Sequence, residues 1–123
     1  MLQHVSLEIG TDQVTACVAF WEQLGFERME PPPLLRNRFI WVQREGTQIH
    51  LIPGEEPNTT VRGHAAVLVE DYEGTLAALI GQGFEIGEGE NAWDAPRSFV
   101  RDPAGNLIEI MSAPPHPPWP GEG

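Results

Sequence analysis

The segment HVSLEI, residues 4–9, decides the fold, because its pattern occurs a second time in the chain. Apolar and polar residues alternate along it, which predicts a half-buried β-strand. At residues 64–69 the sequence reads HAAVLV. The histidines that open the two segments, His4 and His64, are 60 positions apart. The chain therefore contains two copies of one unit.

The first unit continues from this strand with a helix and a hairpin. Thr11 or Asp12 is expected to cap the helix, and Gly25 is expected to end it. The segment TQIHLIP (residues 47–53) should pair with the strand before it through a tight turn at Glu45-Gly46. The expected order is βαβββ, with strands at residues 3–9, 26–29, 39–43 and 48–52 and a helix at 13–24.

The second unit repeats this order at a nearly constant offset. Asp71 is expected to cap its helix and Gly83 to end it. His50 and Glu109, in the last strand of each unit, are 59 positions apart. The expected strands are at residues 63–69, 84–86, 98–101 and 107–111, and the helix extends to about residue 82.

These patterns predict one compact α+β domain built from two βαβββ modules. The modules are expected at residues 1–53 and 63–112, joined by a polar linker at residues 54–62 that carries Gly and Pro. Residues 113–123 (APPHPPWPGEG) form a proline-rich tail, expected to be extended or disordered.

Composition excludes several classes of function. The net charge is −11, which argues against binding to nucleic acid or to an anionic membrane. All seven basic residues are arginine, so lysine-based Schiff-base chemistry is excluded. The single cysteine, Cys17, allows no intramolecular disulfide. The chain opens without a basic leader and has no apolar run of membrane-spanning length, so we expect a cytoplasmic protein.

Four potential metal ligands occupy equivalent places in the two modules, on the first and last strand of each: His4, His50, His64 and Glu109. Alternation puts each of them on the face opposite its aliphatic neighbours. If the aliphatics pack under the helices, the four polar groups point together into the concave side of the sheets. Imidazoles and a carboxylate suit a divalent first-row metal. The alternative is four unrelated core residues, each satisfied by a local hydrogen bond.

The chain resembles the vicinal oxygen chelate superfamily, which includes glyoxalases, bleomycin-resistance proteins and extradiol dioxygenases. The resemblance covers residues 2 to about 112. It rests on the motifs HVSLEI, VAFWEQLGF, TQIHLIP, GHAAVLV and RDPAGNLIEIM. It implies two modules whose mixed sheets form a cup that holds one divalent metal (Ni, Co, Zn, Mn or Fe). The ligand positions match His4, His50, His64 and Glu109.

The resemblance also implies a chemistry. The metal would chelate a small substrate through two neighbouring oxygens and stabilise an enolate or oxyanion. Glu109 is the only carboxylate among the four ligands, so it is the candidate general base. This favours a metal-dependent glyoxalase-like lyase or isomerase, or a related epimerase. Family members commonly pair as homodimers, sometimes exchanging modules between chains.

Two alternatives remain open. An extradiol-type dioxygenase would use Fe(II) with two histidines and one carboxylate, and a fourth ligand at His50 would crowd that site. An antibiotic-binding resistance protein without turnover would suit the acidic chain, with Trp41, Phe39 and Trp93 as aromatic walls. A fosfomycin-type transferase fits less well, because it normally uses three protein ligands and a basic anion pocket.

The turn at residues 45–46 makes one geometric prediction about this wall. A two-residue loop pairs Arg44 with Thr47, and therefore Trp41 with His50. Cross-strand partners share a face, so Trp41 is expected in the cup beside the metal, with Phe39 one step further along. A register slip of one residue would instead place Trp41 in the helix-covered core.

Overall fold

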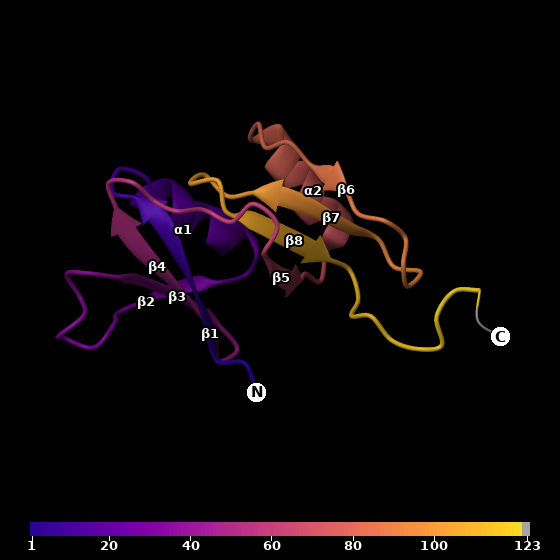
Figure 1. Ribbon diagram of the computed structural model, residues 1–123, viewed down its shortest axis with the longest axis horizontal. Coiled ribbons are helices and arrows are strands. Elements are labelled where there is room, and N and C mark those ends of the chain that lie inside the picture. Colours follow the sequence, from indigo (N-terminus) through magenta and orange to yellow (C-terminus); the bar gives the residue numbers. More distant parts are fainter. Residues whose placement is uncertain (122–123) are drawn as a thin grey trace.

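The computed structural model describes residues 1–121 and contains two βαβββ modules (Figure 1). The first module consists of β1 (His4–Gly10), α1 (Val14–Gln23), β2 (Glu27–Met29), β3 (Ile40–Arg44) and β4 (Thr47–Gly54). The second consists of β5 (Ala65–Leu68), α2 (Tyr72–Gly81), β6 (Gly87–Glu88), β7 (Arg97–Arg101) and β8 (Leu107–Met111). None of the helices within residues 1–121 is long and apolar enough to cross a membrane.

Each module forms its own four-stranded mixed sheet. The strand orders are β1-β4-β3-β2 and β5-β8-β7-β6, with the first two strands of each order parallel and the others antiparallel. The predicted α+β class and the duplicated βαβββ order are confirmed. In both sheets the first strand of the module is an edge strand, so β1 and β5 each keep one unpaired side.

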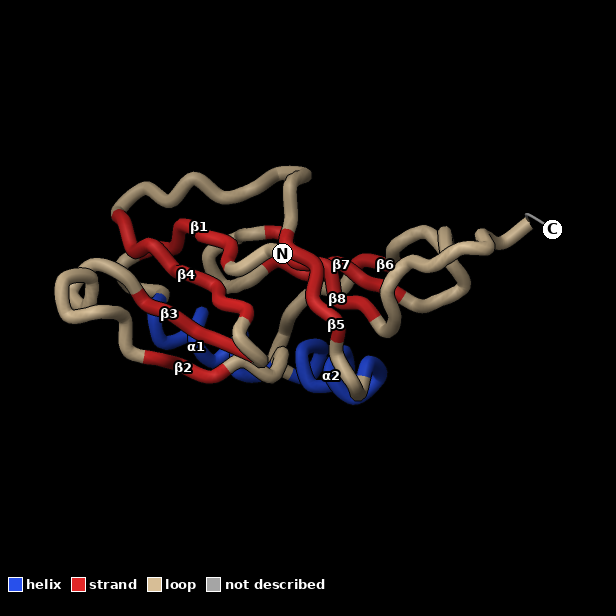
Figure 2. Tube along the Cα trace, turned by 90° about the horizontal axis from the view of Figure 1, so that it is seen from below, coloured by secondary structure: helices blue, strands red, loops and turns tan. Residues whose placement is uncertain are grey.

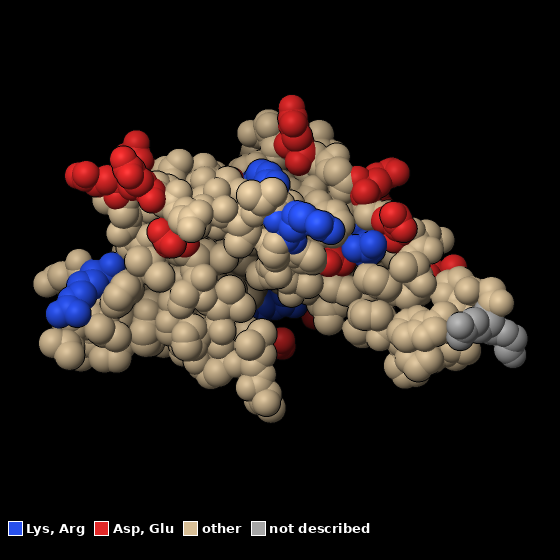
Figure 3. Space-filling model, in the orientation of Figure 1, with Lys and Arg blue, Asp and Glu red and all other residues tan. Residues whose placement is uncertain are grey.

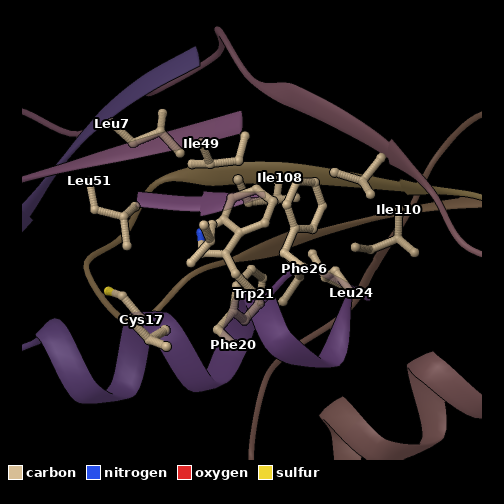
Figure 4. Packing of buried hydrophobic residues seen from close by; sticks show 14 of the residues in the cluster. Leu7, Cys17, Phe20, Trp21, Leu24, Phe26, Ile49, Leu51, Ile108 and Ile110 are labelled. Carbon is tan, nitrogen blue, oxygen red and sulfur yellow. The ribbon is translucent and has the colours of Figure 1, made fainter. Parts of the chain in front are cut away.

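Both helices lie on the same side of the two sheets, and the main core lies beneath them (Figure 2). Trp21 of α1 is fully buried and packs edge-to-face on Phe26. Figure 4 shows these rings beside Ile108 and Ile110 of β8, so the two modules share one core. Truncating such a large core side chain typically costs about 3–5 kcal/mol of stability.

Polar contacts also join the modules. Nη1 of Arg44 donates to the carbonyl of Leu68 at 2.6 Å, and Nδ2 of Asn106 donates to the carbonyl of Glu8 at 2.8 Å. These bonds and the shared core fix the placement of one sheet relative to the other.

The β3–β4 hairpin has the predicted register, with Arg44 opposite Thr47 and Trp41 opposite His50. Its turn residues Glu45 and Gly46 have φ values of 51° and 89°. Positive φ at both positions is what a two-residue type I′ turn requires. The hairpin prediction is therefore confirmed.

Two local predictions are wrong. Neither Thr11 nor Asp12 caps α1; Gln13 occupies that position, and its Oε1 instead accepts from the Gly10 amide at 2.7 Å. The strand expected at residues 84–86 is displaced to β6. Phe84 and Ile86 pack against the core, and only the two residues that follow them align with β7.

Candidate functional site

Three aromatic rings stack on the face of the first sheet that the helices leave uncovered. Trp41 lies flat on His50, with ring centroids 3.9 Å apart and an interplanar angle of 1°. His50 in turn stacks on His4 at 4.0 Å and 16°. The stack follows from register, because β3 pairs Trp41 with His50 while β4 pairs with β1. We call His4, His50 and Trp41 the first half-site.

Both histidines of the first half-site have one ring nitrogen engaged. Nδ1–H of His4 donates to Oε1 of Gln3 at 2.7 Å, and Nε2–H of His50 donates to Oε1 of Gln48 at 2.8 Å. These bonds fix the tautomers and leave Nε2 of His4 and Nδ1 of His50 with free lone pairs. Burial, and then the nearby His4, lower the pKa of His50. The neutral form that a metal needs is therefore favoured.

The second module places a buried carboxylate at the equivalent position. Glu109 on β8 is 4% exposed, and its Oε1 lies 3.0 Å from Nε2 of His64. Nδ1–H of His64 donates to the carbonyl of Arg62 at 2.9 Å, which again directs the other ring nitrogen towards the site. Phe99 stands opposite Glu109 on β7, as Trp41 stands opposite His50. We call His64, Glu109 and Phe99 the second half-site.

Arg97 holds the other oxygen of the buried carboxylate. Its Nη1 lies 3.3 Å from Oε2 of Glu109. The guanidinium also lies 4.7 Å from the ring centre of Trp93 and 5.4 Å from that of Phe99. Its Nε donates to the carbonyl of Glu90 at 3.1 Å. Arg97 thus balances the charge of Glu109 and is itself held between two aromatic side chains.

The three predicted wall residues differ in what they contact. Trp41 is in contact with His50, as the hairpin register predicts. Trp93 contacts Arg97 rather than a candidate ligand, and its indole N–H donates to the carbonyl of Ala113. Phe39 is half-buried and immediately precedes β3.

Arg97 and Phe99 were missed in the sequence. Phe99 could have been found, because it lies 58 positions after Trp41 and therefore occupies the same place in the duplicated hairpin. Arg97 lies 58 positions after Phe39, which is uncharged, so comparing the two modules does not predict a charged residue at this place.

The structure brings the four candidate ligands together in two pairs, His4 with His50 and His64 with Glu109, on separate sheets. Within residues 1–121 no three His, Cys, Asp or Glu side chains are grouped so that they could hold a metal ion. A single chain therefore presents two half-sites, and four-ligand coordination needs both.

The donor sets fit a divalent metal. Each histidine has one nitrogen directed away from its hydrogen-bonded partner, and Glu109 supplies a buried carboxylate oxygen beside the imidazole of His64. Imidazole and carboxylate together suit Zn, Fe, Co, Ni and Mn. Metal-binding histidines usually donate their other ring N–H to a nearby acceptor, and these three histidines do the same.

A cavity of about 560 Å³ lies between the modules. Its wall includes Val5 and Ile49 of the first module and His64 and Leu68 of the second. Leu2 lines it as well, and the side chains of Leu2 and Leu68 are 72% and 43% exposed. An apolar surface therefore lies next to the edge strand β5.

Known structures share this architecture. A structure described as a glyoxalase family protein from Bacillus anthracis is 29% identical over 90% of this chain and 93% of that chain, with a TM-score of 0.80. The fosfomycin resistance protein FosX from Listeria monocytogenes is 15% identical over 93% and 91% of the two chains, with a TM-score of 0.75. Lactoylglutathione lyase from Agrobacterium tumefaciens is 15% identical over 90% and 92%, with a TM-score of 0.65.

At 15% identity the last two similarities show the fold alone. No curated protein matches the chain. The family model of the Glyoxalase/Bleomycin resistance protein/Dioxygenase superfamily matches residues 2–110, which include both half-sites. This match covers nearly the whole chain and accords with its duplicated modules, so the chain belongs to the Glyoxalase/Bleomycin resistance protein/Dioxygenase superfamily.

Proposed function

We propose that the chain is a metal-dependent lyase or isomerase that acts on a small substrate chelated through two neighbouring oxygen atoms. One observation carries the proposal. Each module presents a pair of ligand-type side chains on its last strand and at the start of its first, and every histidine among them has its tautomer fixed by a hydrogen bond. Core histidines with purely local roles would have no reason to share this arrangement.

The metal site is completed by a second copy of the chain. His4 and His50 of one chain meet His64 and Glu109 of the other, so that a homodimer holds two sites. Two features support this pairing. The strands β1 and β5 are free edges next to the two half-sites, and the exposed leucines beside β5 offer an apolar surface for association. When bound, the metal supplies Lewis-acid polarisation of the substrate oxygens.

Glu109 is the base in this proposal and removes a proton from the carbon next to the chelated carbonyl. The carboxylate is buried, so little water competes for it. Arg97 anchors Oε2 and leaves Oε1 facing His64 and the site. The rings of Trp41 and Phe99 lie against His50 and His64, and we expect Phe39 and Trp93 to extend this aromatic wall.

The test combines metal analysis with a proton-exchange assay. Protein purified without a histidine tag should contain about one divalent metal per chain. The metal-loaded protein is then screened in deuterated water against hemithioacetals, 2-oxo and 2-hydroxy acids and acyl thioesters. Metal-dependent deuterium incorporation beside a carbonyl supports the proposal. Metal-free protein that cannot be loaded, with no exchange in any member of the panel, contradicts it.

A second candidate is a binding protein that sequesters a cationic antibiotic without turnover. The flat Trp41–His50–His4 stack favours it, because an aromatic surface in an acidic protein attracts planar cations. Tight binding of such a compound to metal-free protein, without chemical change, would select this candidate. Oxygen uptake with a catechol would instead select a dioxygenase.

A further inference from the structure

A second cavity, of about 530 Å³, lies on the far side of the second module, between α2 and the loop at residues 89–96. Ser98 contributes to its wall, and Ser98 points to the opposite face of β7 from Phe99. The α2 cavity, as we call it, therefore lies on the other side of β7 from Phe99, although Arg97 reaches both the cavity and Glu109. Its volume is within the range of small-molecule binding sites.

The α2 cavity departs from the duplication of the fold. Ser98 is 3% exposed, and its hydroxyl is hydrogen-bonded to that of Tyr72 at 2.5 Å. The equivalent positions of the first module, 58 residues earlier, are Ile40 and Val14, which pack against the core. The module fold therefore does not require hydroxyl groups here, and the bond to Tyr72 offsets the cost of burying the Ser98 hydroxyl.

One wall of the α2 cavity is an apolar stripe on the helix. Tyr72, Leu76 and Ile80 follow one another at four-residue spacing, so they lie on one face of α2. The helix buries Leu79 completely in the core, whereas Ile80 is 58% exposed. The stripe thus offers apolar surface that the fold itself leaves partly open.

The opposite part of the wall is acidic. Glu73, Glu88 and Asp94 line the α2 cavity, and none of them forms an ion pair within residues 1–121. Arg97 also reaches the wall, but its guanidinium is paired with Glu109. Figure 3, which views the side of the molecule that the helices leave uncovered, shows acidic side chains near the place where Figure 1 draws β6 and the loop after it. Three uncompensated carboxylates around a recess concentrate cations there.

We propose that the α2 cavity binds a small organic cation that carries an ammonium group on an apolar body. The ammonium group lies among the carboxylates of Glu73, Glu88 and Asp94, and the body lies on the stripe formed by Leu76 and Ile80. The Tyr72–Ser98 hydroxyl pair has spare acceptor capacity for a polar group of the ligand. Binding in the α2 cavity does not need a metal at the half-sites.

The experiment uses 2-phenylethylammonium chloride as the probe, with 2-phenylethanol as its neutral counterpart. Both are titrated into ¹⁵N-labelled full-length protein and followed through amide chemical shifts. The ammonium compound should saturate shifts at Ile80, Gly89 and Ser98 and bind about tenfold more tightly than the alcohol. The charge-free variant carries Glu73→Gln, Glu88→Gln and Asp94→Asn, and it should lose this tenfold preference.

The matched control removes three exposed carboxylates elsewhere, with Glu22→Gln, Glu55→Gln and Glu56→Gln. Both triple variants lose three negative charges from a net charge of −11, so a general field effect would weaken binding equally in both. If the control keeps the preference for the ammonium compound over the alcohol and the charge-free variant loses it, the result supports binding in the α2 cavity. Equal weakening in both variants, equal binding of ammonium and alcohol, or shifts centred on Trp41 and Phe99 would overturn it.

Discussion

His64, immediately before β5, lies against Glu109 of the neighbouring parallel strand β8, with Oε1 of the carboxylate 3.0 Å from Nε2 of the imidazole. Nδ1–H of His64 is already donated to a backbone carbonyl. Oε1 and Nε2 therefore lie close enough for one metal ion to bind both in the proposed site.

Replacement of Glu109 tests its role as the base. Glu109→Gln keeps the size of the side chain but cannot accept the proton, so turnover should fall by at least about two orders of magnitude. The comparison is made at matched metal occupancy, measured by elemental analysis, because the same change also weakens the metal site. Turnover within about threefold of wild type under those conditions would exclude Glu109 as the base.

Trp41 should report on the first half-site. Because its ring lies 3.9 Å from that of His50, metal or substrate binding at His50 should change its fluorescence. Trp41→Phe is expected to lose most of the response to added metal. Trp93→Phe and Trp119→Phe serve as controls and should keep it. An undiminished response in Trp41→Phe would place the binding event elsewhere.

Arg97 should matter more to the metal-free protein than to the loaded one. Arg97→Ala leaves the carboxylate of Glu109 buried with only His64 beside it. We expect it to lower the free energy of unfolding by about 2–4 kcal/mol without metal. Bound metal would neutralise the carboxylate and reduce this loss. Urea unfolding with and without metal measures both values, and Arg97→Lys, which keeps the charge, should recover part of the stability.

The same loss in both forms would contradict the proposed contact between metal and Glu109. No loss in either form would mean that the ion pair does not stabilise the folded chain.

Asp102 should give the metal-free protein a pH-dependent stability. Burial raises its pKa above the ordinary value of 3.8, although hydrogen bonds from Asn106 oppose the shift. The folded state therefore holds this proton more tightly than the unfolded state. The resulting stabilisation is present below pH 3.8 and is lost as the pH rises through the folded-state pKa. Asp102→Asn lacks this proton equilibrium.

The free energy of unfolding of Asp102→Asn relative to wild type should therefore shift in favour of the variant as the pH rises from about 3.5 to about 7. Chemical denaturation at a series of pH values measures this difference. A difference that does not change with pH would show that the carboxylate titrates alike in the folded and unfolded chains.

Local rules account for much of this fold. The Glu45-Gly46 turn fixes the hairpin register, and Gly25 and Gly83 follow the two helices with φ values of 90° and 94°. Asp71 caps α2 as expected, through a bond from the Gly74 amide at 3.0 Å. Each of these features depends on a few neighbouring residues, which is why the sequence alone predicts them.

The grouping of all four ligands in one metal site stays a prediction. Alternation fixes the face of a sheet on which His4 or Glu109 lies, but not the position of one sheet relative to the other. That position depends on long-range contacts such as Arg44 with the Leu68 carbonyl, and a second chain would add more. The ion pair of Arg97 with Glu109 was missed for a different reason: Arg97 lies opposite Met111 rather than opposite Glu109, and its equivalent in the first module is the uncharged Phe39.

Metal content of a mixed dimer tests the central claim most directly. One chain carries His4→Ala and His50→Ala, the other carries His64→Ala and Glu109→Gln, and the two bear different non-histidine affinity tags. Coexpression and tandem purification give the mixed dimer, which the shared site predicts to contain about one metal, because one complete ligand set survives across the interface. Each variant alone should contain none. A mixed dimer without metal, formed from chains whose wild-type parent is fully loaded, would contradict the shared four-ligand site.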